Sequence, residues 1–270
     1  MKAWSIAHRT LVAAVLLFLP APILIVVLSS FTKAGYIGFP PGELSLRWYA
    51  EFLGSADWLA TMAISAGIAA LAALLSTTVT FLGALAITRQ RLPMTQGLET
   101  LVLLPLIFPH AALGVIMLGL VGIFGWTGEF LGLLLGHFIL TIPYAWRPIV
   151  AAMRKHDLAV EEAAMSLGAP PFYTFRKVTL PLLRPGMVTA LLFTFIISFD
   201  EVTVSLFLVG PDLSTLPVKI FSAIQDSGSP VIAAISAALV VFTMIIVFLL
   251  DRVIGLELFV SAEERRRPAA

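Results

Sequence analysis

Long uncharged stretches alternate with short polar segments along most of this chain. Crossing the hydrocarbon core of a bilayer takes about 20 mostly apolar helical residues. The pattern predicts six such spans, at residues 11–31, 58–88, 100–121, 130–150, 186–210 and 230–250. Prolines inside the spans predict kinks, which a bilayer tolerates when neighbouring helices satisfy the freed carbonyls; these are Pro20, Pro22, Pro105, Pro109 and Pro143. We therefore expect an all-α integral membrane protein. Because no internal repeat is visible, we expect a single domain over residues 1–270.

The composition supports this class independently. Apolar residues make up 59% of the chain, charged residues only 12%, and the mean hydropathy is +1.00. A soluble domain carries about 25% charged residues, so this chain has too little charge to cover a globule in water. The absence of cysteine excludes disulfides, thiolate metal sites and a cysteine nucleophile. The net charge of +1 argues against a nucleic-acid partner, since no basic face can neutralise phosphates.

The first span follows Lys2 and Arg9 and resembles a secretory signal in that respect. It is longer than the roughly 7–15 apolar residues of a signal, and no clear cleavage site ends it. We expect this segment to be a retained helix.

The lysines and arginines predict the orientation. With a cytoplasmic N-terminus, only Lys33, Arg47 and Lys219 lie outside, whereas fourteen cations lie inside. These fourteen are Lys2, Arg9, Arg89, Arg91, Arg147, Arg154, Lys155, Arg176, Lys177, Arg184, Arg252, Arg265, Arg266 and Arg267. Both termini and the polar segment 154–184 should therefore be cytoplasmic. In the external segment, Ser45 is expected to cap a short helix whose aromatic residues lie in the outer interface.

The segment 154–184 contains the run Glu162-Ala163-Ala164-Met165-Ser166-Leu167-Gly168, followed by Val178-Thr179-Leu180-Pro181. Acidic residues, including Glu161, open a predicted helix, where carboxylates meet the positive end of the helix dipole. The small residues of the run leave a thin helix that a partner could approach closely. Pro170 and Pro171 break the chain and open a second helix, which we expect to end at Pro181. The residues alone also fit an ordinary polar loop with capping acids.

This run resembles the "EAA" loop of ABC-importer permeases, with Val178 where isoleucine is usual. The resemblance implies a type I importer fold with cytoplasmic coupling helices, in a bacterial inner membrane. It implies as partners a second permease subunit, two ATPase subunits and a periplasmic solute-binding protein. It also implies that the ATPases contact the loop through Glu161, Glu162, Ala163, Ala164, Gly168, Leu180 and Pro181.

The chain itself lacks the residues for binding ATP. A Walker A loop needs glycine and lysine followed by serine or threonine, and no lysine here follows a glycine. We therefore expect ATP and magnesium to bind the partner ATPases, and this chain to be neither an enzyme nor a cofactor protein. His110 and His137 are isolated in apolar spans; packing or a place in the pathway is the expected role, with metal binding as the alternative.

Two consecutive acids, Asp200 and Glu201, lie in the fifth predicted span. Acids in a bilayer are costly, so they must face water, a partner charge or a solute. Consecutive helical residues point about 100° apart, so we expect one to line the pathway and the other to reach an interface or a backbone donor. The following run, Ser205 to Pro211 and then Leu216-Pro217, resembles the spermidine/putrescine group of permeases, which implies a polyamine or another small cation as solute.

Two alternatives to polyamine import stay open. Sister permeases carry iron, opines, thiosulfate or other solutes. From a different class, a proton-coupled secondary transporter could use Asp200 and Glu201 as titrating groups. Such a carrier does not need a docking loop, and no inverted repeat is visible in the sequence.

Overall fold

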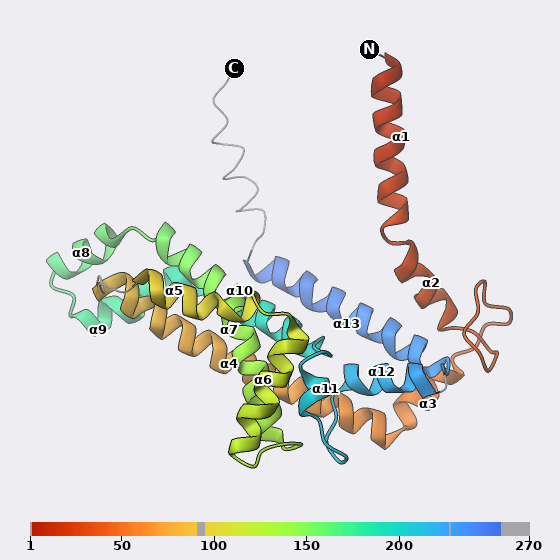
Figure 1. Cartoon of the computed structure of the whole chain (residues 1–270). Helices are drawn as coiled ribbons and strands as arrows, with labels where there is room; N and C mark the ends of the chain where they lie inside the picture. The colour runs from red at the N-terminus through yellow and green to blue at the C-terminus, as the bar shows by residue number, and fades with distance from the viewer. Residues whose placement is uncertain (1, 91–94, 227, 255–270) are drawn as a thin grey trace. The chain divides into compact units, whose positions relative to one another are not determined.

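The computed structural model describes residues 2–90, 95–226 and 228–254, and these form helices joined by loops (Figure 1). The elements are α1 (Lys2–Phe18), α2 (Ala21–Ser29), α3 (Arg47–Gly54), α4 (Ala56–Gln90), α5 (Thr95–Leu103), η1 (Leu104–Leu106), α6 (His110–Ile123), α7 (Phe130–Lys155), α8 (Leu158–Ser166), α9 (Pro171–Thr174), η2 (Phe175–Thr179), α10 (Leu180–Phe199), α11 (Ser205–Leu208), α12 (Leu216–Asp226) and α13 (Val231–Ile254). Arg91, Arg265, Arg266 and Arg267, which support the predicted orientation, lie outside the described residues.

The chain divides into two compact units. One comprises Met1–Ala60 and Lys219–Ile246, and the other Thr61–Val218 and Val247–Ala270. The single-domain interpretation stays a prediction.

Five helices are long and apolar enough to cross a membrane, among the residues that the structure describes. They are His8–Ser29, Ala56–Arg89, Phe130–Lys155, Pro171–Phe199 and Val231–Phe248. A sixth arises only if two shorter helices, Gly97–Leu106 and His110–Ile123, count as one span, and these are bent by 105°. The third predicted span is therefore not one straight helix. Pro109 has extended backbone (ψ 135°) at the break, because a proline cannot continue the preceding helical hydrogen-bond pattern.

Helix α4 packs in the way expected of a membrane helix. Its buried face includes several small residues, among them Ala69, Ala72 and Ala73, all no more than 1% exposed, beside larger ones such as Ile68. Its opposite face presents Leu74 and Leu82, which are 54% and 57% exposed. Small residues let neighbouring backbones approach, and burial from water does not drive association inside a bilayer. The outward leucines suit contact with lipid or with another membrane subunit.

Helices α7 and α10 of the larger unit pack extensively against each other. A side chain at Gly186 would collide with the Ala152 side chain and the Pro148 carbonyl, so glycine permits this approach. Helix α4 joins them through a buried hydrogen bond of 2.7 Å between the hydroxyls of Ser76 and Thr141. Together these helices support the polar features described below.

The fifth predicted span is displaced. The second helix of segment 154–184 does not end at Pro181 but runs on from Pro171 to Phe199 as one 29-residue helix. The turn Phe175–Thr179, which ends two residues before Pro181, is a π-helix. A proline ring normally clashes with the carbonyl four residues earlier, and a wider π turn relieves that clash. The helix then ends at Phe199 instead of continuing to residue 210.

In the smaller unit, α3 forms where the sequence predicts a short helix. The Ser45 hydroxyl accepts a hydrogen bond of 3.2 Å from the Arg47 amide, but the N-cap residue is Leu46, so Ser45 does not hold the predicted capping position. Trp48 and Phe52 are only 6% and 4% exposed, so they pack inside the protein and do not lie open to the membrane interface. Hydrophobic burial against neighbouring elements of the chain outweighs the preference of aromatic residues for the interface.

Candidate functional site

Helix α8 carries the motif of the cytoplasmic segment, and both its ends are well defined. At its start, the Asp157 carboxylate accepts a hydrogen bond of 2.9 Å from the Ala159 amide. At its end, the Gly168 amide donates to the Met165 carbonyl (2.9 Å) and the Ala169 amide to the Ala164 carbonyl (3.1 Å). Gly168 has φ +91°, and this left-handed residue with its two bonds makes a Schellman motif. Gly168 thus ends the helix through its backbone, a role that the sequence reasoning missed.

The two neighbouring glutamates of α8 point in different directions. Glu161 is buried, with 5% exposure, whereas Glu162 is exposed. Because consecutive residues of a helix diverge by about 100°, only one of them can face the protein. Glu162 is therefore available to a partner, and Glu161 is not.

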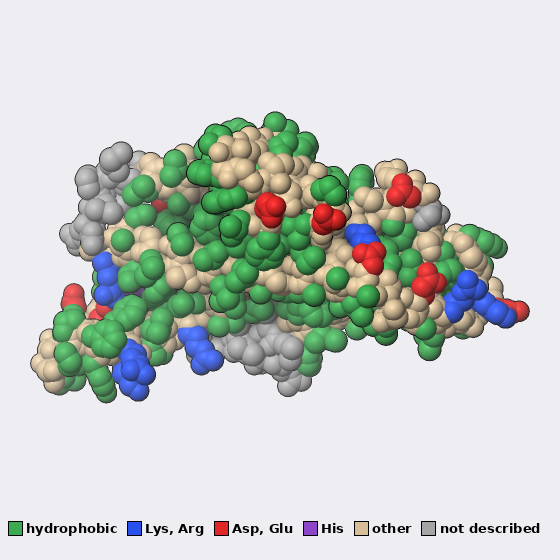
Figure 2. Space-filling view, turned by 90° about the horizontal axis from the view of Figure 1, so that it is seen from below, with side chains coloured by type: hydrophobic (Ala, Val, Ile, Leu, Met, Phe, Trp, Pro, Cys, Tyr) green, Lys and Arg blue, Asp and Glu red, His purple; other side chains and the backbone are tan. Residues whose placement is uncertain are grey.

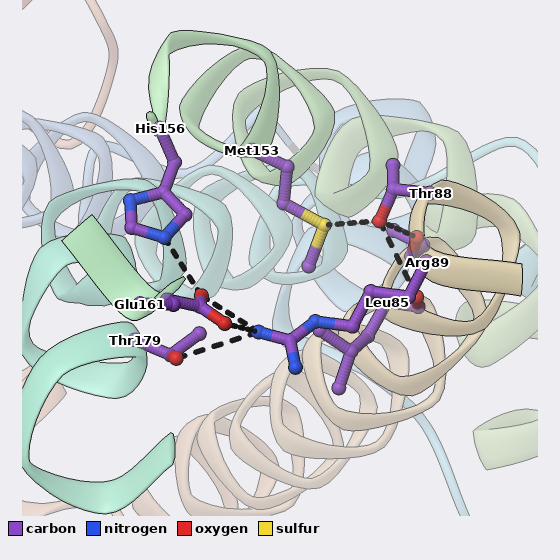
Figure 3. Close-up of polar contacts among 8 residues, drawn as sticks. Leu85, Thr88, Arg89, Met153, His156, Glu161 and Thr179 are labelled. Carbon is purple, nitrogen blue, oxygen red and sulfur yellow. Dashed lines mark hydrogen bonds and ion pairs between the residues drawn. The ribbon is translucent and has the colours of Figure 1, made fainter. Parts of the chain in front are cut away.

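Glu161 is held by residues from three other parts of the chain (Figure 3). Nη2 of Arg89, at the end of α4, donates to Oε1 and Oε2 of Glu161 at 2.7 and 2.5 Å. Nε2 of His156, which follows α7, lies 2.7 Å from Oε1. The same Arg89 nitrogen also lies 3.4 Å from the hydroxyl of Thr179, in the π turn. One carboxylate therefore joins α4, the end of α7, α8 and the start of the long helix.

These contacts set the charge of Glu161. Burial alone would raise the pKa of this carboxyl group. Hydrogen bonds from Thr179 and His156, together with the positive charges of Arg89 and His156, outweigh burial and leave the pKa below its usual value of 4.5. Glu161 is consequently ionised at neutral pH, and an ionised carboxylate only accepts hydrogen bonds, so His156 must donate through Nε2.

The outer surface of the segment is apolar as well as acidic. Leu167 is 90% exposed, Phe172 75%, Tyr173 55% and Met165 43%. Hydrophobic side chains cover much of the face in Figure 2, and Lys and Arg side chains lie near the end that carries α8 and α9. Met165 and Leu167 lie outside the candidate spans, and Phe172 and Tyr173 lie in the first turn of the span Pro171–Phe199. A large apolar patch beside polar residues is typical of an interaction surface. The sequence reasoning did not single out Leu167 or Phe172, although a lone leucine and phenylalanine flanking Gly168 and the prolines were a usable signal.

The remaining residues predicted for this site differ in their accessibility. Ala163 is exposed and Ala164 is partly exposed, both on α8. Leu180 is partly buried against the cluster around Trp146 and Leu183, and Pro181 is exposed at the first turn of α10. Leu180 and Pro181 therefore belong to the long helix and not to a separate coupling helix.

Asp200 and Glu201 lie on a sharp turn between α10 and α11, not in the middle of a helix. Asp200 follows the last residue of α10 and is exposed. Glu201 is 6% exposed. Its Oε1 accepts a hydrogen bond of 2.7 Å from the Val204 amide, and its Oε2 lies 3.3 Å from Nδ1 of His110. The structure thus gives one acid a backbone donor and leaves the other open.

His137 holds the same turn from α7. Its ring is 1% exposed, with Nδ1 at 2.8 Å from the Ser198 hydroxyl and Nε2 at 2.9 Å from the Ser205 hydroxyl. Ser205 also donates to the Glu201 carbonyl at 3.1 Å. His137 therefore braces the two ends of the acidic turn, and no cluster of potential metal ligands occurs among the described residues.

Comparisons with known proteins identify the family. Residues 79–256 match the family described as "Binding-protein-dependent transport system inner membrane component". The spermidine/putrescine transport system permease protein PotC of Haemophilus influenzae is 34% identical over 233 residues, covering 86% of this chain and 90% of that protein. The putrescine transport system permease protein PotI of Escherichia coli is 30% identical over 226 residues, covering 81% and 80%.

Solved structures support the same fold. A bacterial ABC transporter that imports the acidic polysaccharide alginate is similar with a TM-score of 0.66 and 17% identity, over 94% of this chain and 96% of that chain. At this identity the likeness concerns the fold alone. The family match over residues 79–256 shows that the chain belongs to the inner membrane components of binding-protein-dependent transport systems, the permeases of ABC importers.

Proposed function

We propose that this chain is one of two permease subunits of an ATP-driven importer, and that α8 with its exposed apolar patch receives an ATPase subunit. The observation that carries the proposal is the exposure of Glu162 and Leu167, which lie outside the candidate spans, together with that of Phe172 at the first turn of the span Pro171–Phe199. Exposed apolar side chains outside the bilayer are stabilised by a partner that covers them. The apolar contacts would supply affinity, and Glu162 would pair with a cation of the partner.

Transport then follows from movement of this segment. Closure of the two ATPases on ATP would draw the two α8 segments of the permease pair together and open the cavity outward. A periplasmic binding protein would release its solute there, and hydrolysis would return the cavity to the inward-facing state. ATP and magnesium would bind the ATPases, and both termini of this chain would lie in the cytoplasm, in accord with the distribution of lysines and arginines.

The solute that we propose is a polyamine, which Asp200 would contact directly. The two relatives described above are named as permeases for spermidine and putrescine, and for putrescine. An exposed carboxylate beside the low-dielectric interior attracts an ammonium group more strongly than it would in water. Glu201 would contribute mainly by shaping the turn, since its oxygens already face Val204 and His110.

A different solute is the second candidate within the same function. A putative 2-aminoethylphosphonate transport system permease protein, PhnV of Salmonella paratyphi A, is 29% identical over 260 residues. That compound also carries an amine, so Asp200 fits either solute. Uptake of radiolabelled putrescine and of 2-aminoethylphosphonate, measured in parallel, distinguishes the two.

The test of the importer function is reconstitution of the permease with its partners in vesicles. Uptake should require the ATPase, ATP and the loaded binding protein together. A proton-coupled carrier would instead accumulate solute without ATPase, driven by an imposed pH gradient. Solute uptake by the purified chain alone under such a gradient would refute the importer proposal.

A further inference from the structure

The buried carboxylate of Glu161 contacts residues that are distant in the chain. We call the contacts among Glu161, Arg89 and His156 the connection. Its partners are Arg89, 72 residues earlier in the chain, and His156, which ends α7. The Thr179 hydroxyl, at the opposite end of the segment, lies beside the same Arg89 nitrogen. Figure 3 shows these side chains converging on Glu161 from separate helices.

Glu161 and His156 are protected from water, whereas Arg89 is partly open to it. The side chains of Glu161 and His156 are each 7% exposed, and that of Arg89 is 38% exposed. Ion pairs between exposed residues contribute little, because water and salt compete for both charges. A buried carboxylate behaves differently, because it must keep its partners or remain uncompensated. Glu161, Arg89 and His156 should therefore stay together while the loop moves.

The connection also lies next to the surface at which an ATPase would displace α8. Under the proposed function, the ATPase contacts Glu162 on the exposed side of α8, Leu167 directly after it and Phe172 in α9. Glu161 directly precedes Glu162, points about 100° away from it around the helix, and is buried. A displacement of α8 is therefore applied one residue away from the contact that leads to α4.

We propose that Glu161, Arg89 and His156 are positioning residues that transmit the displacement of α8 to α4, so that both move as one body during ATP-driven transport. This inference rests on the proposed function. Helix α4 runs from Ala56 to Gln90, so a shift at its Arg89 end reaches the full depth of the membrane. Glu161 thereby couples ATP hydrolysis to transport without contacting ATP, the ATPase or the solute.

The primary experiment compares uptake with ATP hydrolysis in reconstituted vesicles carrying Glu161→Gln or Arg89→Gln. We expect the ATPase to co-purify and hydrolyse ATP, whereas solute transported per ATP falls by about fivefold or more, the usual lower size of a coupling between sites. The matched control is Glu99→Gln, which removes an exposed ion pair with Arg154 (3.4 Å). It should leave the ratio unchanged.

Each other outcome contradicts the inference in a different way. An unchanged ratio of solute to ATP in both variants would show that the connection transmits nothing. Loss of ATPase association would make Glu161 a docking residue instead. If the wild-type complex itself shows no ATP-dependent uptake, the proposed function fails, and the inference that rests on it fails with it.

A second measurement avoids destabilised variants. The chain contains no cysteine, so single cysteines can be introduced at Ala159 of α8 and Leu82 of α4, both exposed, and spin-labelled in the otherwise wild-type complex. The distance between the labels should stay constant when ATP is added, while the distance between the two α8 segments of the permease pair changes. A change in the distance between α8 and α4 on adding ATP would overturn the inference.

Discussion

Replacing Gly168 should affect the protein through its backbone and not through the volume of the new side chain. Gly168 has φ +91°, and a Cβ added there would meet no other atom within 4 Å. Left-handed backbone costs an ordinary L-residue about 1–2 kcal/mol, whereas asparagine is tolerated at this position of a Schellman motif. We therefore expect Gly168→Ala to be more damaging than Gly168→Asn, although alanine is smaller.

The expected acceleration of hydrogen exchange depends on the two hydrogen bonds that end α8. A cost of about 1–2 kcal/mol shifts the equilibrium between the closed and the frayed end of the helix by about 5- to 30-fold. The amides of residue 168 and Ala169 donate these bonds, so their hydrogen exchange should accelerate by that factor in Gly168→Ala. ATP-dependent uptake should fall in the same order, with alanine below asparagine and glycine highest.

The opposite order would refute this reasoning. If Gly168 is needed because a partner approaches it closely, side-chain volume decides, and Gly168→Ala should transport better than Gly168→Asn. Hydrogen exchange separates the two explanations without a partner, since it is measured on the permease alone. Wild-type exchange at residue 168 and Ala169 in Gly168→Ala would rule out the backbone explanation.

Further predictions concern the acidic turn, the exposed patch, pH and ATP. Asp200→Asn should raise the KM for a polyamine by about tenfold or more, because it loses one hydrogen bond to a charged group. Glu201→Gln should chiefly lower the Tm of the purified permease. Equal KM values for the two variants would contradict the separate roles of Asp200 and Glu201. Phe172→Ser should weaken co-purification of the ATPase by about 10- to 100-fold, since covering such a side chain contributes about 1.5–3 kcal/mol, and normal co-purification would exclude this contact. The pKa of Glu161 is lower in the folded than in the unfolded state, so the stabilisation of the fold by ionised Glu161 is complete above about pH 4.5 and is lost as the pH falls through the folded value. Over that range the Tm of the wild type should fall relative to that of Glu161→Gln. Parallel pH profiles of the two Tm values would contradict the ion pair. The purified permease should not bind a fluorescent ATP analogue, and saturable binding would overturn the assignment of ATP to the partner.

Much of the architecture is determined by the sequence, because insertion of a helix into a bilayer depends mainly on local apolar length. The runs 58–88, 130–150 and 230–250 became α4, α7 and α13 with ends shifted by a few residues. The resemblance of residues 162–168 to the "EAA" loop also led to the family to which residues 79–256 belong. These inferences needed only neighbouring residues.

Tertiary structure decided the features that depend on distant residues or on strain in the backbone. Local hydropathy could not place the end of α10 at Phe199, because the apolar run continues past the turn that His137 braces from α7. The sequence predicted a kink at Pro109 but not a bend of 105°, since the size of a proline kink in a bilayer depends on its neighbours. In each case an apolar run predicted more helix than the folded chain contains.

The different roles of Glu161 and Glu162 also could not be predicted from the sequence. In the sequence they are two equivalent acids at the start of a helix. Only the fold brings Arg89 and His156 to one of them, 72 and 5 residues away along the chain. A buried carboxylate requires such partners, so their position determines which glutamate anchors the segment and which is free to meet another subunit.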